Sequence, residues 1–128
     1  MKMSLCCMRN SLLGLVLSLL ANVAVADQFA DGFQAATARD YAQAVEKWKP
    51  LAESGHPDAQ LFLAMLHHSG SFGAVNEKEA LKWYHKAAGN GNYTAQEYLA
   101  VGYKEGWFGL KKSSSKSQFW EKKLRAQE

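Results

Sequence analysis

An internal repeat of 36 residues is the feature that most constrains how this chain can fold. Shifting the sequence by that length brings identical residues into register at ten places without a gap. The coincident pairs are Ala44 and Ala80, Ala52 and Ala88, Gly55 and Gly91, Ala59 and Ala95, Gln60 and Gln96, Leu63 and Leu99, Ala64 and Ala100, Gly70 and Gly106, Phe72 and Phe108, and Gly73 and Gly109. Trp48, Tyr84 and Trp120 form an aromatic series with the same spacing. Such a period is typical of solenoids, in which each unit buries its apolar face only against its neighbours.

Each half of the repeat has the apolar periodicity of an amphipathic helix. Tyr41, Ala44 and Trp48 recur at steps of three and four residues, which places them on one helical face. Asp40 and Asn76 precede patterned segments, as expected of N-caps. Glycines stand where the patterns stop, as expected of C-terminal caps, at Gly55, Gly70, Gly91 and Gly106. The sequence therefore predicts six helices, over residues 28–38, 41–54, 57–69, 77–89, 93–105 and 115–127.

The linkers between these helices are short, so neighbouring helices are expected to pack antiparallel as hairpins. About three such hairpins predict an all-α fold, a short right-handed α-solenoid. Trp48, Tyr84 and Trp120 should then fill the space between hairpins and be largely buried. The last helix is basic, which suits a solvated helix that caps the stack.

The first 26 residues have the order of a secretory signal peptide. Lys2 and Arg9 give a positive start, residues 11–20 form an apolar run, and residues 24–26 read Ala-Val-Ala, a small-residue cleavage site. We therefore expect a signal peptide over residues 1–26, cleaved after Ala26, a mature domain over residues 27–128, and a periplasmic or secreted protein. An uncleaved N-terminal anchor is the alternative, although the apolar run is short for spanning a bilayer.

Charge and cysteine content limit the functions of the expected mature chain. The sequence has 15 basic and 12 acidic residues, and removal of Lys2 and Arg9 leaves 13 basic residues and a net charge of +1. This nearly neutral balance lacks the excess of basic residues that is typical of nucleic-acid-binding proteins. Both cysteines, Cys6 and Cys7, lie in the removed segment, so packing rather than disulfides must hold the domain together. With no second long apolar run, we expect no stable membrane insertion after cleavage.

Two segments carry a resemblance to a known family. Residues 80–88 read Ala-Leu-Lys-Trp-Tyr-His-Lys-Ala-Ala and are followed by Gly91 and then Ala95-Gln96, which resembles the Sel-one-like repeat, a relative of the tetratricopeptide repeat. Residues 48–55 resemble the entry unit common in exported members. The resemblance covers about residues 28–127 and implies a helical-repeat fold with a protein-binding role. The sequence departs from the family pattern at Ala64, Ala100 and His67, where glycine, glycine and tyrosine are usual.

Candidate catalytic and metal-binding residues are few. The histidines that could suggest a metal site are His56, His67, His68 and His85. Adjacent histidines point to different helix faces, however, and no cysteine or close carboxylate completes a ligand set. His85 with Glu77 or Glu79 could form an acid/base pair, but an ordinary solvated helix face also explains these residues. No nucleophile or phosphate-loop motif is present. The sequence predicts no metal, no cofactor and no enzymatic activity.

The surface of the predicted first helices offers candidates for partner binding, because in the resembling families these helices line the concave side. Leu61, Met65 and His68 lie at steps of four and three residues and form a second stripe beside the core stripe. Such a stripe is either a binding groove or more core. Loop aromatics form a second candidate set, although Phe108 coincides with Phe72 across the repeat, which also fits a structural role. The candidate partner-binding residues are Leu61, Met65, His68, Glu97, Val101, Lys104, Trp107 and Phe108.

The function expected from these observations is binding of a protein or peptide partner in the cell envelope, as an adaptor, scaffold or inhibitor. Resemblance to small exported family members makes an immunity protein that blocks a toxic effector one form of this role. A cell-envelope enzyme or enzyme subunit acting on cell-wall material is the alternative. A structural cap within a larger assembly is a third reading.

Overall fold

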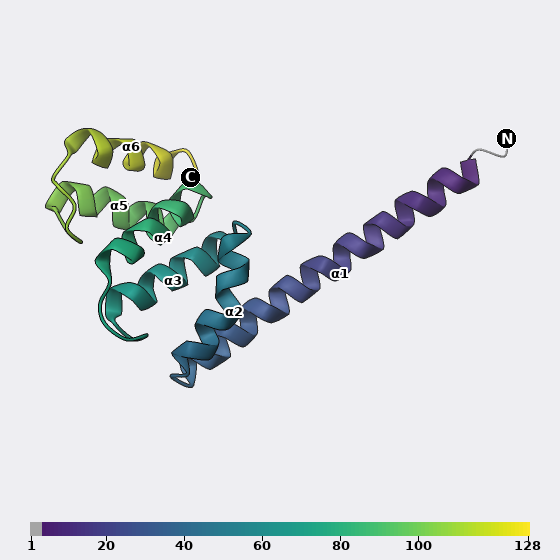
Figure 1. Ribbon diagram of the computed structural model, residues 1–128. Coiled ribbons are helices and arrows are strands. Elements are labelled where there is room, and N and C mark those ends of the chain that lie inside the picture. The colour runs from purple at the N-terminus through teal and green to yellow at the C-terminus, as the bar shows by residue number, and fades with distance from the viewer. Residues whose placement is uncertain (1–3) are drawn as a thin grey trace.

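The computed structural model describes the backbone of residues 4–128 and the side chains of residues 14–128. This part of the chain folds into six α-helices and contains no strand (Figure 1). The helices are α1 (Ser4–Thr37), α2 (Tyr41–Glu53), α3 (Pro57–Ser69), α4 (Glu77–Gly89), α5 (Tyr93–Glu105) and α6 (Ser114–Arg125). Each helix packs against the next, and α1–α2, α3–α4 and α5–α6 form three hairpins of an all-α repeat solenoid.

The helix bounds match the sequence prediction closely except at the N-terminus. The segment expected over 28–38 is the C-terminal part of a much longer helix, because α1 begins at Ser4 and continues without a break through Ala26 and Asp27. The apolar leader contains no proline, and Gly14 is its only glycine, so nothing in its composition ends the helix before Thr37.

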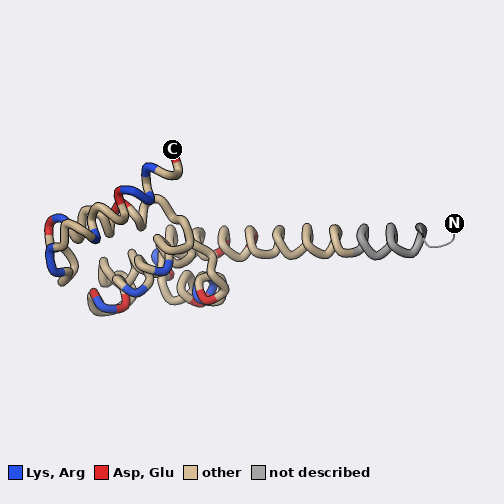
Figure 2. The backbone as a smooth tube through the Cα atoms, turned by 90° about the horizontal axis from the view of Figure 1, so that it is seen from above, with Lys and Arg blue, Asp and Glu red and all other residues tan. Residues whose placement is uncertain are grey.

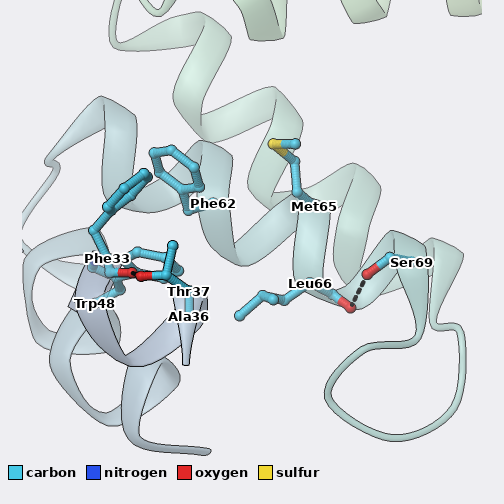
Figure 3. Close-up of a pocket in the computed structure, with 8 residues that line it drawn as sticks. All are labelled: Phe33, Ala36, Thr37, Trp48, Phe62, Met65, Leu66 and Ser69. Carbon is cyan, nitrogen blue, oxygen red and sulfur yellow. Dashed lines mark hydrogen bonds between the residues drawn. The ribbon is translucent and has the colours of Figure 1, made fainter. Parts of the chain in front are cut away.

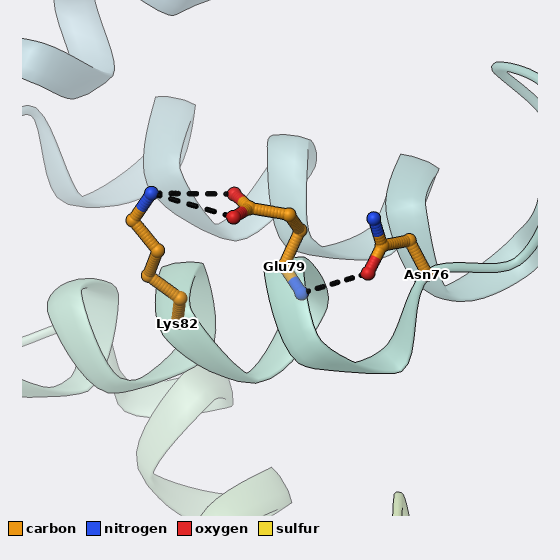
Figure 4. Close-up of polar contacts among 3 residues, drawn as sticks. All are labelled: Asn76, Glu79 and Lys82. Carbon is orange, nitrogen blue, oxygen red and sulfur yellow. Dashed lines mark hydrogen bonds and ion pairs between the residues drawn. The ribbon is translucent and has the colours of Figure 1, made fainter.

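Four N-cap residues form two pairs whose members lie 36 residues apart, as the repeat requires. Asp40 and Asn76 each accept a hydrogen bond at 3.1 Å, from the backbone N–H of Gln43 and Glu79 respectively, which confirms both as caps. Figure 4 shows the bond between Asn76 and Glu79. His56 and Asn92 cap α3 and α5 in the same way, at 3.3 and 2.8 Å. A side-chain acceptor at this position satisfies one of the free donors of the first helical turn. Equivalent positions of the repeat therefore have the same capping role, in addition to the same place in the core.

The aromatic series of the repeat lies in the core, as its spacing predicts. Trp48 and Tyr84 are each 1% exposed, and Trp120 is also buried. The Trp48 indole N–H donates to the carbonyl oxygen of Phe29 at 3.1 Å and so ties α2 to α1. A side chain at Gly32 would overlap the same indole ring, so only glycine allows the two helices to approach this closely.

Two buried glutamines make the same hydrogen bond in successive repeats. The Gln60 side-chain amide donates to the carbonyl oxygen of Ala52 at 2.8 Å, and Gln96 donates to that of Ala88 at 3.0 Å. The Gln60 side-chain oxygen in turn accepts a hydrogen bond from Asn90 at 3.0 Å. Because buried polar groups are costly when unpaired, these bonds fix how each first helix sits against the helix before it.

The N-terminal part of α1 extends away from the helical domain (Figures 1 and 2). Every side chain from residue 14 to residue 27 is exposed, including Leu15, Leu17 and Leu20, and burial begins at Gln28. Among the described residues, Gly14–Thr37 is the one helical segment that is long and apolar enough to cross a membrane, a property that signal sequences share. Residues 14–26 contain no charged side chain, and Figure 2 shows this described part of the projecting helix without charge.

Candidate functional site

The first helices of the three hairpins each expose a large apolar side chain at the same position. Phe33, Met65 and Val101 lie four residues before the last residue of α1, α3 and α5 respectively. Their side chains are 49%, 39% and 37% exposed. The hairpins pack against one another without burying these three side chains. Phe33, Met65 and Val101 therefore form an exposed apolar row on the solenoid.

A hollow of about 310 Å³ lies between Phe33 of α1 and Met65 of α3 (Figure 3). Phe62 forms part of its wall, with its ring edge-on to Phe33 at a centroid distance of 6.0 Å. The buried Trp48 lies behind Phe62 and stacks on it at 4.9 Å. These aromatic contacts brace the wall of the hollow from within the core.

A second hollow of about 240 Å³ adjoins the first, because Met65 and Ser69 line both. His68, Tyr84 and Tyr98 complete its lining. The His68 Nδ1 atom lies 3.3 Å from the Tyr84 hydroxyl. Burial, reinforced by the neighbouring Tyr98, raises the pKa of Tyr84 above its usual value, so its hydroxyl keeps its proton and can donate to the imidazole.

A third hollow of about 370 Å³ continues from the second through Tyr98, which lines both. Its other lining residues are Thr94, Glu97, Val101 and Trp107. We call the three joined hollows the groove, marked from end to end by Phe33, Phe62, Met65, Tyr98, Val101 and Trp107. The groove thus crosses α1, α3, α5 and the linker that follows α5.

Phe108 anchors that linker against the groove. Its ring packs edge-on against His68 at 4.2 Å and lies 6.0 Å from Tyr84 and 6.2 Å from Tyr98. Its backbone is left-handed, with φ of 57°, which is strained for a bulky residue, so the ring contacts must offset that cost. By inserting its ring, Phe108 holds the neighbouring Trp107, which is 49% exposed, at the end of the groove.

The structure brings most of the sequence-predicted residues together and separates three. Met65, Glu97, Val101 and Trp107 line the groove, and His68 lines its middle hollow. Leu61 is buried in the core, so its assignment to a partner-binding surface is wrong. As part of the middle hairpin, α3 has a hairpin on each side, and the face that carries Leu61 is covered.

Lys104 and Phe108 also differ from the expected arrangement. Lys104 is exposed but lines a separate hollow between α5 and α6, away from Glu97 and Val101. Phe108 is half-buried and holds the linker in place, whereas its repeat equivalent Phe72 is exposed. The coincidence of the two phenylalanines therefore does not reflect one shared structural role.

The groove residues that were not among the candidates include Phe33, Phe62, Thr94 and Tyr98. A gap-free shift of 36 residues places Phe33 opposite Ser69, because the linker over residues 38–40 is shorter than the one over residues 70–76. Counting back from the helix ends instead aligns Phe33 with Met65 and Val101. Phe62 and Tyr98 are repeat equivalents that belong to the core stripe and reach the surface only at their edges.

The side chains of His56, His68 and His85 make structural contacts within the fold. His85 Nε2 lies 3.2 Å from the Tyr103 hydroxyl, and its ring packs near Trp120. Glu79 instead forms an exposed ion pair with Lys82, at 3.3 Å (Figure 4). In the part of the chain that the structure describes, no group of three or more His, Cys, Asp or Glu side chains is gathered as metal ligands would be.

Acidification should destabilise the fold through His85. Burial lowers the pKa of His85 below its usual value of about 6.5, and the positive charge of Lys116 lowers it further. As the pH falls through about 6.5, the unfolded chain binds a proton that the folded protein resists, so stability decreases. We expect the thermal midpoint to fall between about pH 7 and about pH 5.5, and His85→Gln to weaken that dependence. An unchanged pH dependence in the variant would contradict this assignment.

Comparison with known proteins places the fold in a family. The family model of the Sel1 repeat matches residues 57–92 and 94–123, which together make up more than half of the chain. A search of the solved structures finds the crystal structure of a Sel1 repeat protein from Oxalobacter formigenes, with a TM-score of 0.71 and 26% sequence identity. That likeness covers 88% of this chain and 89% of the other. No curated protein matches the sequence.

Proposed function

The chain belongs to the Sel1 repeat family, and on that premise we propose that it binds a protein or peptide partner through the groove, in the cell envelope. Sel1 repeats generally mediate protein–protein interaction. The observation that carries the proposal is that each of the three hollows shares lining residues with the next, across all three hairpins. A groove of this length fits an extended segment of a partner better than a compact small molecule.

The composition of the groove supports this proposal. Phe33, Met65 and Trp107 are exposed, and aromatic residues and methionine are enriched where proteins contact one another. Contiguous exposed apolar surface on a monomer also marks interaction sites. An adaptor, a scaffold and an inhibitor of the immunity type would all use such a surface. Identification of the partner would distinguish the adaptor, scaffold and inhibitor roles from one another.

The proposed function is tested by capture of the partner. The full chain with a C-terminal tag, expressed in its native host, is purified from an envelope extract, and co-purifying proteins are identified by mass spectrometry. A protein recovered with the wild-type chain and lost from a groove variant supports the proposal. Recovery of the same proteins with both chains would place binding elsewhere.

We also propose that the chain is exported and cleaved after Ala26. Among residues 14–128, the contacts between the side chains of α1 and the rest of the domain begin at Gln28, which donates to the carbonyl oxygen of Lys47 at 2.9 Å, and at Phe29, whose carbonyl oxygen accepts from Trp48. Cleavage at this point would remove the exposed apolar part of α1 and keep every one of these contacts. N-terminal sequencing of the protein from its native host is expected to begin at Asp27. An intact Met1 in the membrane fraction would instead support an uncleaved anchor.

A further inference from the structure

The groove carries a single formal charge. Of the residues that line its three hollows, all in the described part of the chain, Glu97 alone is charged at neutral pH, and no lysine or arginine is among them. Glu97 is exposed and lies in the third hollow with Tyr98, Val101 and Trp107. The groove is therefore apolar along most of its length and acidic at one end.

Within residues 14–128, no lysine or arginine forms an ion pair with Glu97. The positions three and four residues away on α5 hold Tyr93, Thr94, Ala100 and Val101, so no helical neighbour can pair with the carboxylate. Across residues 14–128, the one ion pair joins Lys82 to Glu79. The negative charge of Glu97 is thus available to a ligand in the groove.

The aromatic surface beside Glu97 is likewise uncovered. Elsewhere in the described chain, lysine side chains lie over the rings of other aromatic residues, as Lys86 does over Trp83 at 4.6 Å and Lys116 does over Tyr103 at 5.1 Å. None of the cation–π contacts in this part of the molecule involves Trp107 or Tyr98. Trp107 is half exposed, and tryptophan gives the strongest attraction for a cation over its ring.

We propose that the partner presents a peptide segment with a basic side chain, which docks against Glu97 and Trp107, and large apolar side chains, which fill the hollows beside Met65 and Phe33. The inference rests on the proposed function and specifies the chemistry of the partner. Arginine fits the third hollow best, because its planar guanidinium can stack on an indole and donate two hydrogen bonds to a carboxylate at once. Packed helices lie about 10 Å apart, so anchors in adjoining hollows would be about three residues apart in an extended segment.

Selection from a random peptide library displayed on phage tests this chemistry on the purified full chain. The wild-type chain is expected to enrich peptides that combine arginine or lysine with large apolar residues. Glu97→Lys should lose the enrichment of basic residues. A synthetic copy of the best selected peptide should bind Glu97→Gln about tenfold more weakly than the wild type, a loss of about 1.4 kcal/mol. Raising the salt concentration should weaken binding to the wild type more than to the variant.

Glu105→Gln is the matched control. Glu105 is also an exposed glutamate of α5 but does not line the groove, so its substitution should leave peptide affinity unchanged. Both glutamates are exposed, so neither variant is expected to unfold, and circular dichroism checks this directly.

The possible outcomes separate the inference from the proposed function. Selected peptides that are apolar without basic residues, and that bind Glu97→Gln as well as the wild type, would overturn the inference and leave the groove as a binding site. If the wild-type chain selects no peptide, or if Met65→Lys binds the selected peptide with full affinity, the proposed function itself fails. Self-association that depends on Glu97, seen in analytical ultracentrifugation, would make a second copy of the chain the occupant and would also overturn the inference.

Discussion

Tyr84→Ala is expected to lower the free energy of unfolding by about 3 kcal/mol, the scale of a large aromatic truncation in a packed core. Tyr84 is 1% exposed, and its ring lies 5.2 Å from that of Tyr98 and 6.0 Å from that of Phe108. Its hydroxyl also pairs with His68. Truncation removes these contacts at the point where the second and third hairpins meet. Urea unfolding followed by circular dichroism measures the change.

Tyr93→Ala provides the matched control, since the same atoms are removed from a side chain that is 44% exposed at the start of α5. That substitution should cost less than about 1 kcal/mol. Tyr84→Phe, which keeps the ring and loses only the hydroxyl, should cost about 1 kcal/mol. Equal destabilisation by Tyr84→Ala and Tyr93→Ala would mean that the 36-residue register does not define the core.

The double substitution of Met65 and Val101 by lysine should reduce partner affinity at least about tenfold, or 1.4 kcal/mol, while the chain still folds. Both side chains are exposed, so the new charges remain hydrated in the free protein. In the complex they would be removed from water beside apolar anchors, which is costly without a counter-charge. Titration calorimetry with the captured partner measures the affinity, and circular dichroism measures helical content.

Val75→Lys is the control for the double variant. Val75 is an exposed apolar residue in the linker between α3 and α4, and it does not line the groove. The same kind of charge there should leave affinity unchanged. A double variant that folds and keeps full affinity would show that the partner binds another surface.

Most of the fold could be predicted from the sequence because the repeat determines it locally. Gly70 and Gly106 end α3 and α5 in the left-handed conformation that glycine adopts without strain, and Asp40 and Asn76 cap the helices that they precede. These residue types, found at the same position in each repeat, were enough to predict where α2 and α4 begin and where α3 and α5 end. The length of α1 could not be predicted, because the apolar order of the leader indicates a targeting signal and does not indicate whether that segment continues the first helix.

The groove could be predicted only in part. The sequence of one helix does not show which neighbouring helices cover its stripe of apolar residues, so it does not distinguish Leu61 from Met65. In the stack of hairpins, Leu61 is buried and Met65 is exposed. Phe33 was missed because a change in linker length shifts its register. The role of Phe108 depends on a left-handed backbone that no sequence pattern indicates for a phenylalanine.

Photo-cross-linking in living cells tests the central claim most directly, since it reports contact with a partner without requiring that the partner be known. The photoreactive amino acid p-benzoylphenylalanine replaces Phe33, at one end of the groove, or Phe119, an equally exposed phenylalanine on α6 that does not line it. After irradiation, the Phe33 variant is expected to give a discrete cross-linked species that contains the partner, and the Phe119 variant is expected to give none. A cross-link from Phe119 with none from Phe33 would contradict the assignment of the groove as the partner-binding surface.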